Sequence, residues 1–128
     1  GAVIVDDYAH HPTELAATLA TAKEMGYDRV IAVHQPFTFS RTKMLMDEFA
    51  KVLSAADQVV LLPIMGGREK DDGTVKSEDL AAKLAGSVVV DGLEGAANWV
   101  KQNAKKGDLV VCMSCGDLYK AADMMAGK

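Results

Sequence analysis

The chain has 128 residues, 49% of them hydrophobic, which is the size of one domain and enough to bury a core. Its net charge is -4 and its 14 basic residues form no run of three, so we expect small-molecule partners and no nucleic acid. No apolar stretch approaches the roughly 18 residues of a membrane span and no signal-peptide pattern is present, so we expect a cytoplasmic protein without membrane contact. Because the chain opens directly into a strand, we expect residues 1–128 to be a single domain cut from a longer protein.

Segment 6–12 brings two carboxylates, a phenol and two imidazoles close together. The apolar run 2–5 before it is typical of a strand that is buried on both faces. Pro12 fits the first position of a helix, and Glu14 can bond back to the open backbone N–H at the helix start, which predicts His11 as the cap residue. The polar segment is therefore expected on a strand-to-helix turn.

The same unit of an apolar strand followed by an amphipathic helix recurs along the chain. Gly26 is expected to end the first helix, Ser40 to cap the second, Ser77 the third and Asp117 the last. Segment 65–74 is too rich in glycine and mixed charge for a helix and predicts a mobile loop. The expected strands are residues 2–5, 29–33, 59–62, 88–90 and 109–112, and the expected helices are 13–25, 41–56, 77–84, 94–105 and 118–125.

Strands that alternate with helices predict an α/β fold with a parallel sheet covered on both faces. Polar residues that no periodicity explains follow four of the strands, at 6–11, 34–41, 66–69 and 114–117. The carboxyl ends of parallel strands share one edge, so these segments should converge on one crevice. The alternative is that they are ordinary polar loops, because a fold does not by itself imply a function.

Arg41 is expected in the first turn of a helix, where the helix dipole disfavours a cation by about 0.3–1 kcal/mol. An anionic ligand such as a carboxylate would compensate, because a helix start and an arginine together offer backbone amides and a two-bond fork. The alternative is a solvent-exposed arginine paired with Asp7 or Glu48.

His10 and His11 invite a metal interpretation, but adjacent side chains on a turn point in different directions and zinc sites have wider spacings, so no metal site built by the protein is expected. A polar contact from His10 to a ligand is the preferred role. Cys112 and Cys115 form C-x-x-C, which would suit a redox pair. The favoured interpretation is that Cys112 is a small hydrophobe at the end of a buried strand.

Four segments together resemble the C-terminal domain of the Mur ligases, most closely the branch that adds alanine. They are residues 3–14, which contain the specific block Asp-Asp-Tyr-Ala-His-His-Pro, then 34–36, 40–42 and 115–117. The resemblance covers the whole chain and implies a Rossmann-like, mostly parallel sheet of about five or six strands. It also implies ATP-dependent amide formation between UDP-N-acetylmuramate and L-alanine through an acyl phosphate, in peptidoglycan synthesis.

In that family a central domain, absent here, carries the P-loop and binds most of the ATP and Mg²⁺, and the chain itself contains no P-loop motif. The resemblance therefore implies no catalytic residue within this domain alone, and an isolated domain that is inactive. It implies that Asp7 faces the ribose of the nucleotide, and that Tyr8, His10 and Arg41 line the amino acid, with Arg41 on its carboxylate.

One position departs from the family pattern. Many members have His-Arg where this chain has Phe37-Thr38, so a second arginine for the carboxylate is missing and the identity of the amino acid stays open. Two alternatives also stay open: the ligase that recycles murein tripeptide, and a non-catalytic αβ module that binds an anion.

Overall fold

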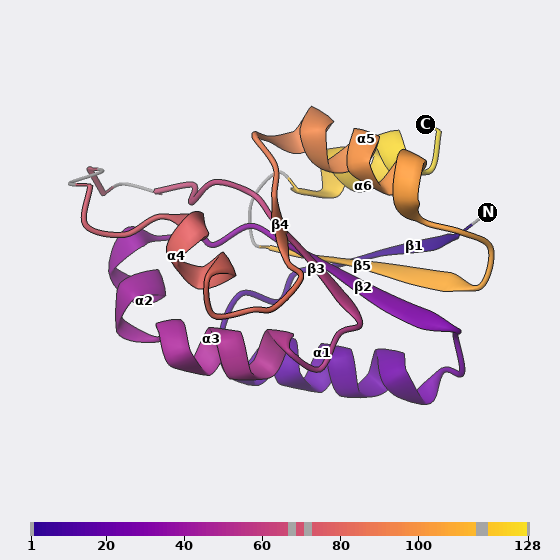
Figure 1. The fold of residues 1–128 in the computed structure, drawn as a ribbon, viewed down its shortest axis with the longest axis horizontal. Coiled ribbons are helices and arrows are strands. Elements are labelled where there is room, and N and C mark those ends of the chain that lie inside the picture. Colours follow the sequence, from indigo (N-terminus) through magenta and orange to yellow (C-terminus); the bar gives the residue numbers. More distant parts are fainter. Residues whose placement is uncertain (1, 67–68, 71–72, 115–117, 128) are drawn as a thin grey trace.

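The computed structural model describes residues 2–66, 69–70, 73–114 and 118–127. It contains one sheet of five parallel strands with helices on both faces, so the predicted α/β fold is confirmed (Figure 1). The strands are β1 (Val3–Asp7), β2 (Arg29–His34), β3 (Gln58–Leu61), β4 (Val88–Val89) and β5 (Asp108–Met113). The helices are α1 (Pro12–Glu24), α2 (Phe39–Met44), α3 (Met46–Leu53), α4 (Ser77–Ala81), α5 (Leu93–Asn103) and α6 (Leu118–Met125).

The strand order in the sheet is β1-β5-β2-β3-β4, so β5, the last strand of the chain, lies between β1 and β2. β5 pairs with β1 on one side and with β2 on the other, both in parallel. All five strands therefore end at the same edge, and the segments that follow them lie along that edge.

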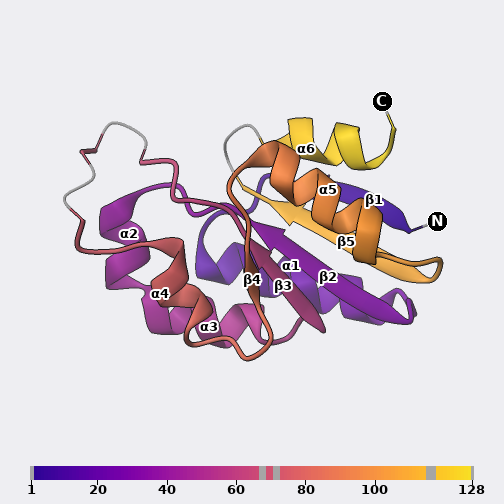
Figure 2. The same ribbon diagram turned by 45° about the horizontal axis from the view of Figure 1, so that its top comes forward.

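Two hydrophobic clusters fill the spaces between the sheet and its helices. α1, α3 and α4 cover one face, and α5 and α6 cover the other (Figures 1 and 2). Leu15 and Leu19 of α1 and Leu53 of α3 are fully buried against the first face. Within the described ranges the longest helix, α1, has 13 residues, and no helix could span a membrane.

β1 lies at the outer edge of the sheet, so the expectation that residues 2–5 form a strand buried on both faces is wrong. Val3 is 42% exposed and Val5 is 36% exposed. A continuous apolar run marks the central strands β2 and β5 equally well, and it carries no information on which strand becomes the edge.

The start of α1 matches the sequence prediction. His11 is the cap residue: its Nδ1 accepts from the N–H of Thr13 at 3.2 Å, and the carboxylate of Glu14 accepts from the N–H of His11 at 3.1 Å. This bond, with a second one from the N–H of His10, lowers the pKa of Glu14. Gly26, which follows the helix, has φ +81°, the left-handed conformation expected of a helix-ending glycine.

The single helix expected after Ser40 is two helices. Leu45, with φ -108° and ψ 19°, separates α2 from α3. The cap of α2 is Thr38, whose hydroxyl oxygen accepts from the N–H of Arg41 at 3.3 Å, and not Ser40. The expected cap Ser77 is likewise the first residue of α4, and its hydroxyl donates to the buried carbonyl of Leu62.

Candidate functional site

The carboxyl edge of the sheet gathers the segments that follow β1, β2 and β3. Figure 1 shows α2 and α4 beyond the ends of the strands, on the side opposite the chain termini. The predicted residues Tyr8, His10 and Arg41 all belong to these segments. Residues 115–117, which include Cys115 and the predicted cap Asp117, lie outside the described residues.

Tyr8 and His10 form a pair at this edge. Their rings meet edge to face with centroids 6.5 Å apart and planes at 82°. Tyr8 is 70% exposed, whereas His10 is half-buried with its Nδ1 3.4 Å from a carboxylate oxygen of Glu14. A phenol and an imidazole are thus held side by side and open to solvent.

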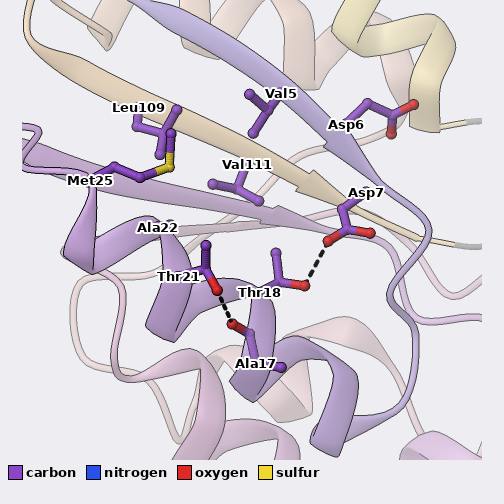
Figure 3. Close-up of a pocket in the computed structure, with 10 residues that line it drawn as sticks. All are labelled: Val5, Asp6, Asp7, Ala17, Thr18, Thr21, Ala22, Met25, Leu109 and Val111. Carbon is purple, nitrogen blue, oxygen red and sulfur yellow. Dashed lines mark hydrogen bonds between the residues drawn. The ribbon is translucent and has the colours of Figure 1, made fainter.

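Asp7 and Asp6 point to opposite faces of β1, as adjacent strand residues must. Asp7 faces α1, where its Oδ2 accepts from the hydroxyl of Thr18 at 2.6 Å (Figure 3). It borders a cavity of about 340 Å³ between β1 and α1, whose other walls include Val5 and Met25. Asp6 faces α6, where burial and then the charges of Asp123 and Asp7 raise its pKa.

Arg41 is the third residue of α2, and its guanidinium makes no ion pair with any residue the structure describes, Asp7 and Glu48 included. The solvent-exposed ion pair considered as an alternative is therefore not formed. Arg41 lies in the first turn of a helix, as predicted, but α2 has only 6 residues, so Arg41 also lies within one turn of the C-terminal end and the effects of the two helix ends oppose each other there.

The structure brings Tyr8 and His10 together but separates both from Arg41 by one strand. Because β5 lies between β1 and β2, the ends of those two strands are on the order of 10 Å apart. No direct contact joins Arg41 to Tyr8 or His10 among the contacts of the described residues. The three side chains therefore do not form one cluster.

His34, the last residue of β2, is a buried side chain whose position the sequence did not reveal. Its Nδ1 lies 2.8 Å from the carbonyl oxygen of Met113, and its ring stacks on Phe49 at 5.6 Å. A carbonyl only accepts, so Nδ1 carries the proton, and Nε2, which has no hydrogen-bond partner among the residues that the structure describes, is a buried acceptor. Burial, and to a lesser degree the charge of His10, lowers the pKa of His34 to about 4 against the opposing hydrogen bond to Met113.

We expect His34 to make the domain unstable in mild acid. The unfolded imidazole gains its proton near pH 6.5 and the folded one near pH 4, so stability is full above pH 6.5 and falls as the pH drops towards 4. The shift corresponds to a loss on the order of 3 kcal/mol. Urea denaturation of residues 1–128 between pH 7 and 4.5 measures it. His34→Phe, which keeps a ring packed on Phe49, should lose much less unfolding free energy over this pH range. An equal fall with pH in both proteins would show that His34 is not the cause.

Cys112 behaves as the predicted small hydrophobe. It is fully buried in the centre of the sheet, and burial, followed by the charge of Asp6, raises its pKa to about 12. A thiol that stays protonated at neutral pH is a poor nucleophile, so Cys112 does not have the properties of a redox cysteine.

The sequence and the fold both match proteins of one family. A family model described as "Mur ligase, glutamate ligase domain" matches residues 1–116. The chain belongs to the Mur ligase family. The resemblance drawn from segment 3–14 and the shorter motifs is therefore confirmed.

Among curated Mur ligases, the UDP-N-acetylmuramate–L-alanine ligase of Acetivibrio thermocellus is 42% identical over 125 residues, which are 94% of this chain. The chain spans 27% of the length of that relative. Among solved structures, a murein peptide ligase from Psychrobacter arcticus matches 99% of this chain and 28% of its own with a TM-score of 0.75 and 25% identity.

A crystallised single domain is also similar. It comes from a Haemophilus ducreyi protein described as a UDP-N-acetylmuramate:L-alanyl-γ-D-glutamyl-meso-diaminopimelate ligase, and the match covers 99% of this chain and 94% of that one, with a TM-score of 0.73 and 26% identity. A Mur ligase piece of this length has thus been crystallised separately from the rest of its enzyme.

Proposed function

We propose that residues 1–128 are the C-terminal domain of an ATP-dependent ligase that joins UDP-N-acetylmuramate to L-alanine. The observation that carries this proposal is the 42% identity, along nearly the whole chain, to a protein named for that reaction. The segment 6–14, with the exposed Tyr8 beside the half-buried His10 and its capped helix start, agrees with a role in binding.

In this proposal the chain binds and orients the amino acid. ATP, with a magnesium ion held mainly by its phosphates, converts the muramyl carboxylate into an acyl phosphate, which the amine of L-alanine attacks with release of ADP and phosphate. Arg41 offers two N–H groups in one plane to the carboxylate of alanine, and no described partner competes for them. Tyr8 and His10 form the opposite wall, so that the small side chain of alanine lies between them and Arg41.

Asp7 fits the proposed contact to the nucleotide ribose. Thr18 occupies one carboxylate oxygen, Oδ2, while the side chain as a whole remains exposed at the edge of the sheet. Its other oxygen has no hydrogen bond to any described residue and can accept from a ribose hydroxyl. The remaining nucleotide contacts, to phosphates and Mg²⁺, are assigned to the central domain, since this chain contains no P-loop motif.

The full-length protein tests this proposal in a phosphate-release assay with ATP, Mg²⁺, UDP-N-acetylmuramate and one amino compound at a time. We expect release with L-alanine, with omission of any component reducing it to background. Glycine and D-alanine serve as controls for the size and the configuration of the side chain. Phosphate release with the murein tripeptide, not attached to N-acetylmuramate, and none with L-alanine would favour the recycling ligase. No release under any condition would favour a non-catalytic anion-binding module.

A further inference from the structure

Two backbone hydrogen bonds join the loop after β3 to the loop after β2. The N–H of Met65 donates to the carbonyl of Pro36 at 2.9 Å, and the N–H of Gly66 donates to the carbonyl of Phe37 at 2.8 Å. Gly66 has φ +92°, and a Cβ at this position would lie 2.9 Å from the ring of Phe39. Glycine at position 66 therefore allows the two loops to meet at contact distance.

From the same loop, the carboxylate of Glu69 reaches the start of α2. Its Oε1 accepts from the N–H of Ser40 at 3.0 Å, and its Oε2 accepts from the hydroxyl of Ser40 at 2.5 Å. The N–H of Ser40 is one of the backbone donors that a helix start leaves open. Glu69, 29 residues further along the chain, thus shares the capping of α2 with Thr38.

The position of α2 depends on these two caps more than on the helix itself. With 6 residues, α2 is far shorter than a helix that is stable in isolation. Thr38 fixes the first turn from within the segment, and the buried Thr42 donates to the carbonyl of Thr38 at 2.6 Å. Glu69 joins the same turn to the loop after β3, which runs past α2 in Figure 2, and it is the side chain of that loop that bonds to the residue before Arg41.

We propose that Glu69 is a positioning residue for amino-acid binding, and that it acts by holding the turn of α2 from which Arg41 projects. The inference rests on the proposed function, in which Arg41 binds the carboxylate of L-alanine. An ionised carboxylate is an acceptor only, so Glu69 cannot itself bind the substrate carboxylate. Its two bonds to Ser40, the residue before Arg41, make it suited to fix the direction of the arginine.

A double-mutant cycle in the full-length protein tests the inference. We expect Glu69→Ala to raise the KM for L-alanine about tenfold while kcat and the KM for ATP change less than about twofold. Glu69→Gln, which keeps one acceptor oxygen, should raise this KM by a smaller factor. In the Arg41→Ala background, Glu69→Ala should cause no further rise in the KM for L-alanine, because the arginine through which Glu69 acts is gone.

Ser40→Ala is the milder variant of the same contact, since it removes one of the two bonds and leaves the backbone intact. It should raise the KM for L-alanine in the same direction and by a smaller factor. Glu24→Ala, which removes an exposed carboxylate at the far end of α1, is the matched control and should leave kcat and the KM values for ATP and L-alanine unchanged.

Three results would overturn the inference. If the separate effects of Glu69→Ala and Arg41→Ala on the KM for L-alanine multiply in the double variant, Glu69 acts independently of Arg41. Equal rises in the KM for ATP and for L-alanine would indicate a general structural role. An unchanged KM for L-alanine in Glu69→Ala, with a raised KM in Arg41→Ala, would contradict the inference and leave the proposed site standing. An unchanged KM in Arg41→Ala as well would contradict both.

Discussion

Arg41→Ala in the full-length ligase should lower kcat/KM for L-alanine roughly 30- to 1000-fold, while the KM for ATP changes little. Without the guanidinium, the substrate carboxylate is desolvated without a charge partner, which costs about 2–4 kcal/mol. Thr38, which caps the same helix, cannot replace it, because a hydroxyl group carries no positive charge. Steady-state kinetics with L-alanine and ATP varied in turn measures both effects.

Two further variants make this result specific. Arg41→Lys should recover only part of the loss, because an ammonium group cannot form the planar two-bond contact of a guanidinium. Lys43→Ala, which removes an exposed cation two residues along the same helix, is the matched control and should behave as wild type. A fall in ATP affinity with unchanged alanine dependence in Arg41→Ala would place Arg41 on the nucleotide side and reverse the proposed assignment.

The isolated 128-residue chain should fold cooperatively and release no phosphate above background from ATP, UDP-N-acetylmuramate and L-alanine. A transition state is bound more tightly than the substrates only when both walls of the cleft are present, and in this proposal the phosphate and muramyl sites belong to other domains. The expected loss of activity is therefore complete. Cooperative folding is expected because clusters on both faces of the sheet are fully formed within the chain.

A coupled phosphate assay on the purified chain, with the full-length protein as positive control, measures this expectation. Circular dichroism on the same sample, followed through thermal unfolding, establishes that the chain is folded when it is assayed. Phosphate release that depends on both L-alanine and the muramyl nucleotide would show that the chain contains a complete active site, contrary to the proposal.

The local signals in the sequence determined the elements and one helix start in detail. Apolar runs that alternate with amphipathic segments predicted the five strands, and His11, Pro12 and Glu14 predicted the capping box of α1. The capping box was predictable because its contacts join residues at most four apart, and the strands were recognisable because the apolar pattern lies within each segment, although their pairing does not. The motif in segment 6–12 was also sufficient to indicate the family.

The tertiary structure alone decided where these elements lie. Strand pairing placed β5 between β1 and β2, which left β1 exposed at the edge and separated Tyr8 and His10 from Arg41 by one strand. A hydrophobic run looks the same in an edge strand and in a central one, because its burial depends on strands distant in sequence.

The capping of α2 and the burial of His34 have the same origin. Ser40 looked like a helix cap, but its hydroxyl and its N–H both donate to Glu69, a residue 29 positions away. His34 looked like one polar residue among others after a strand, yet Phe49 and Met113 enclose it. Both depend on contacts between segments that only the folded chain brings together, and no spacing within either segment encodes them.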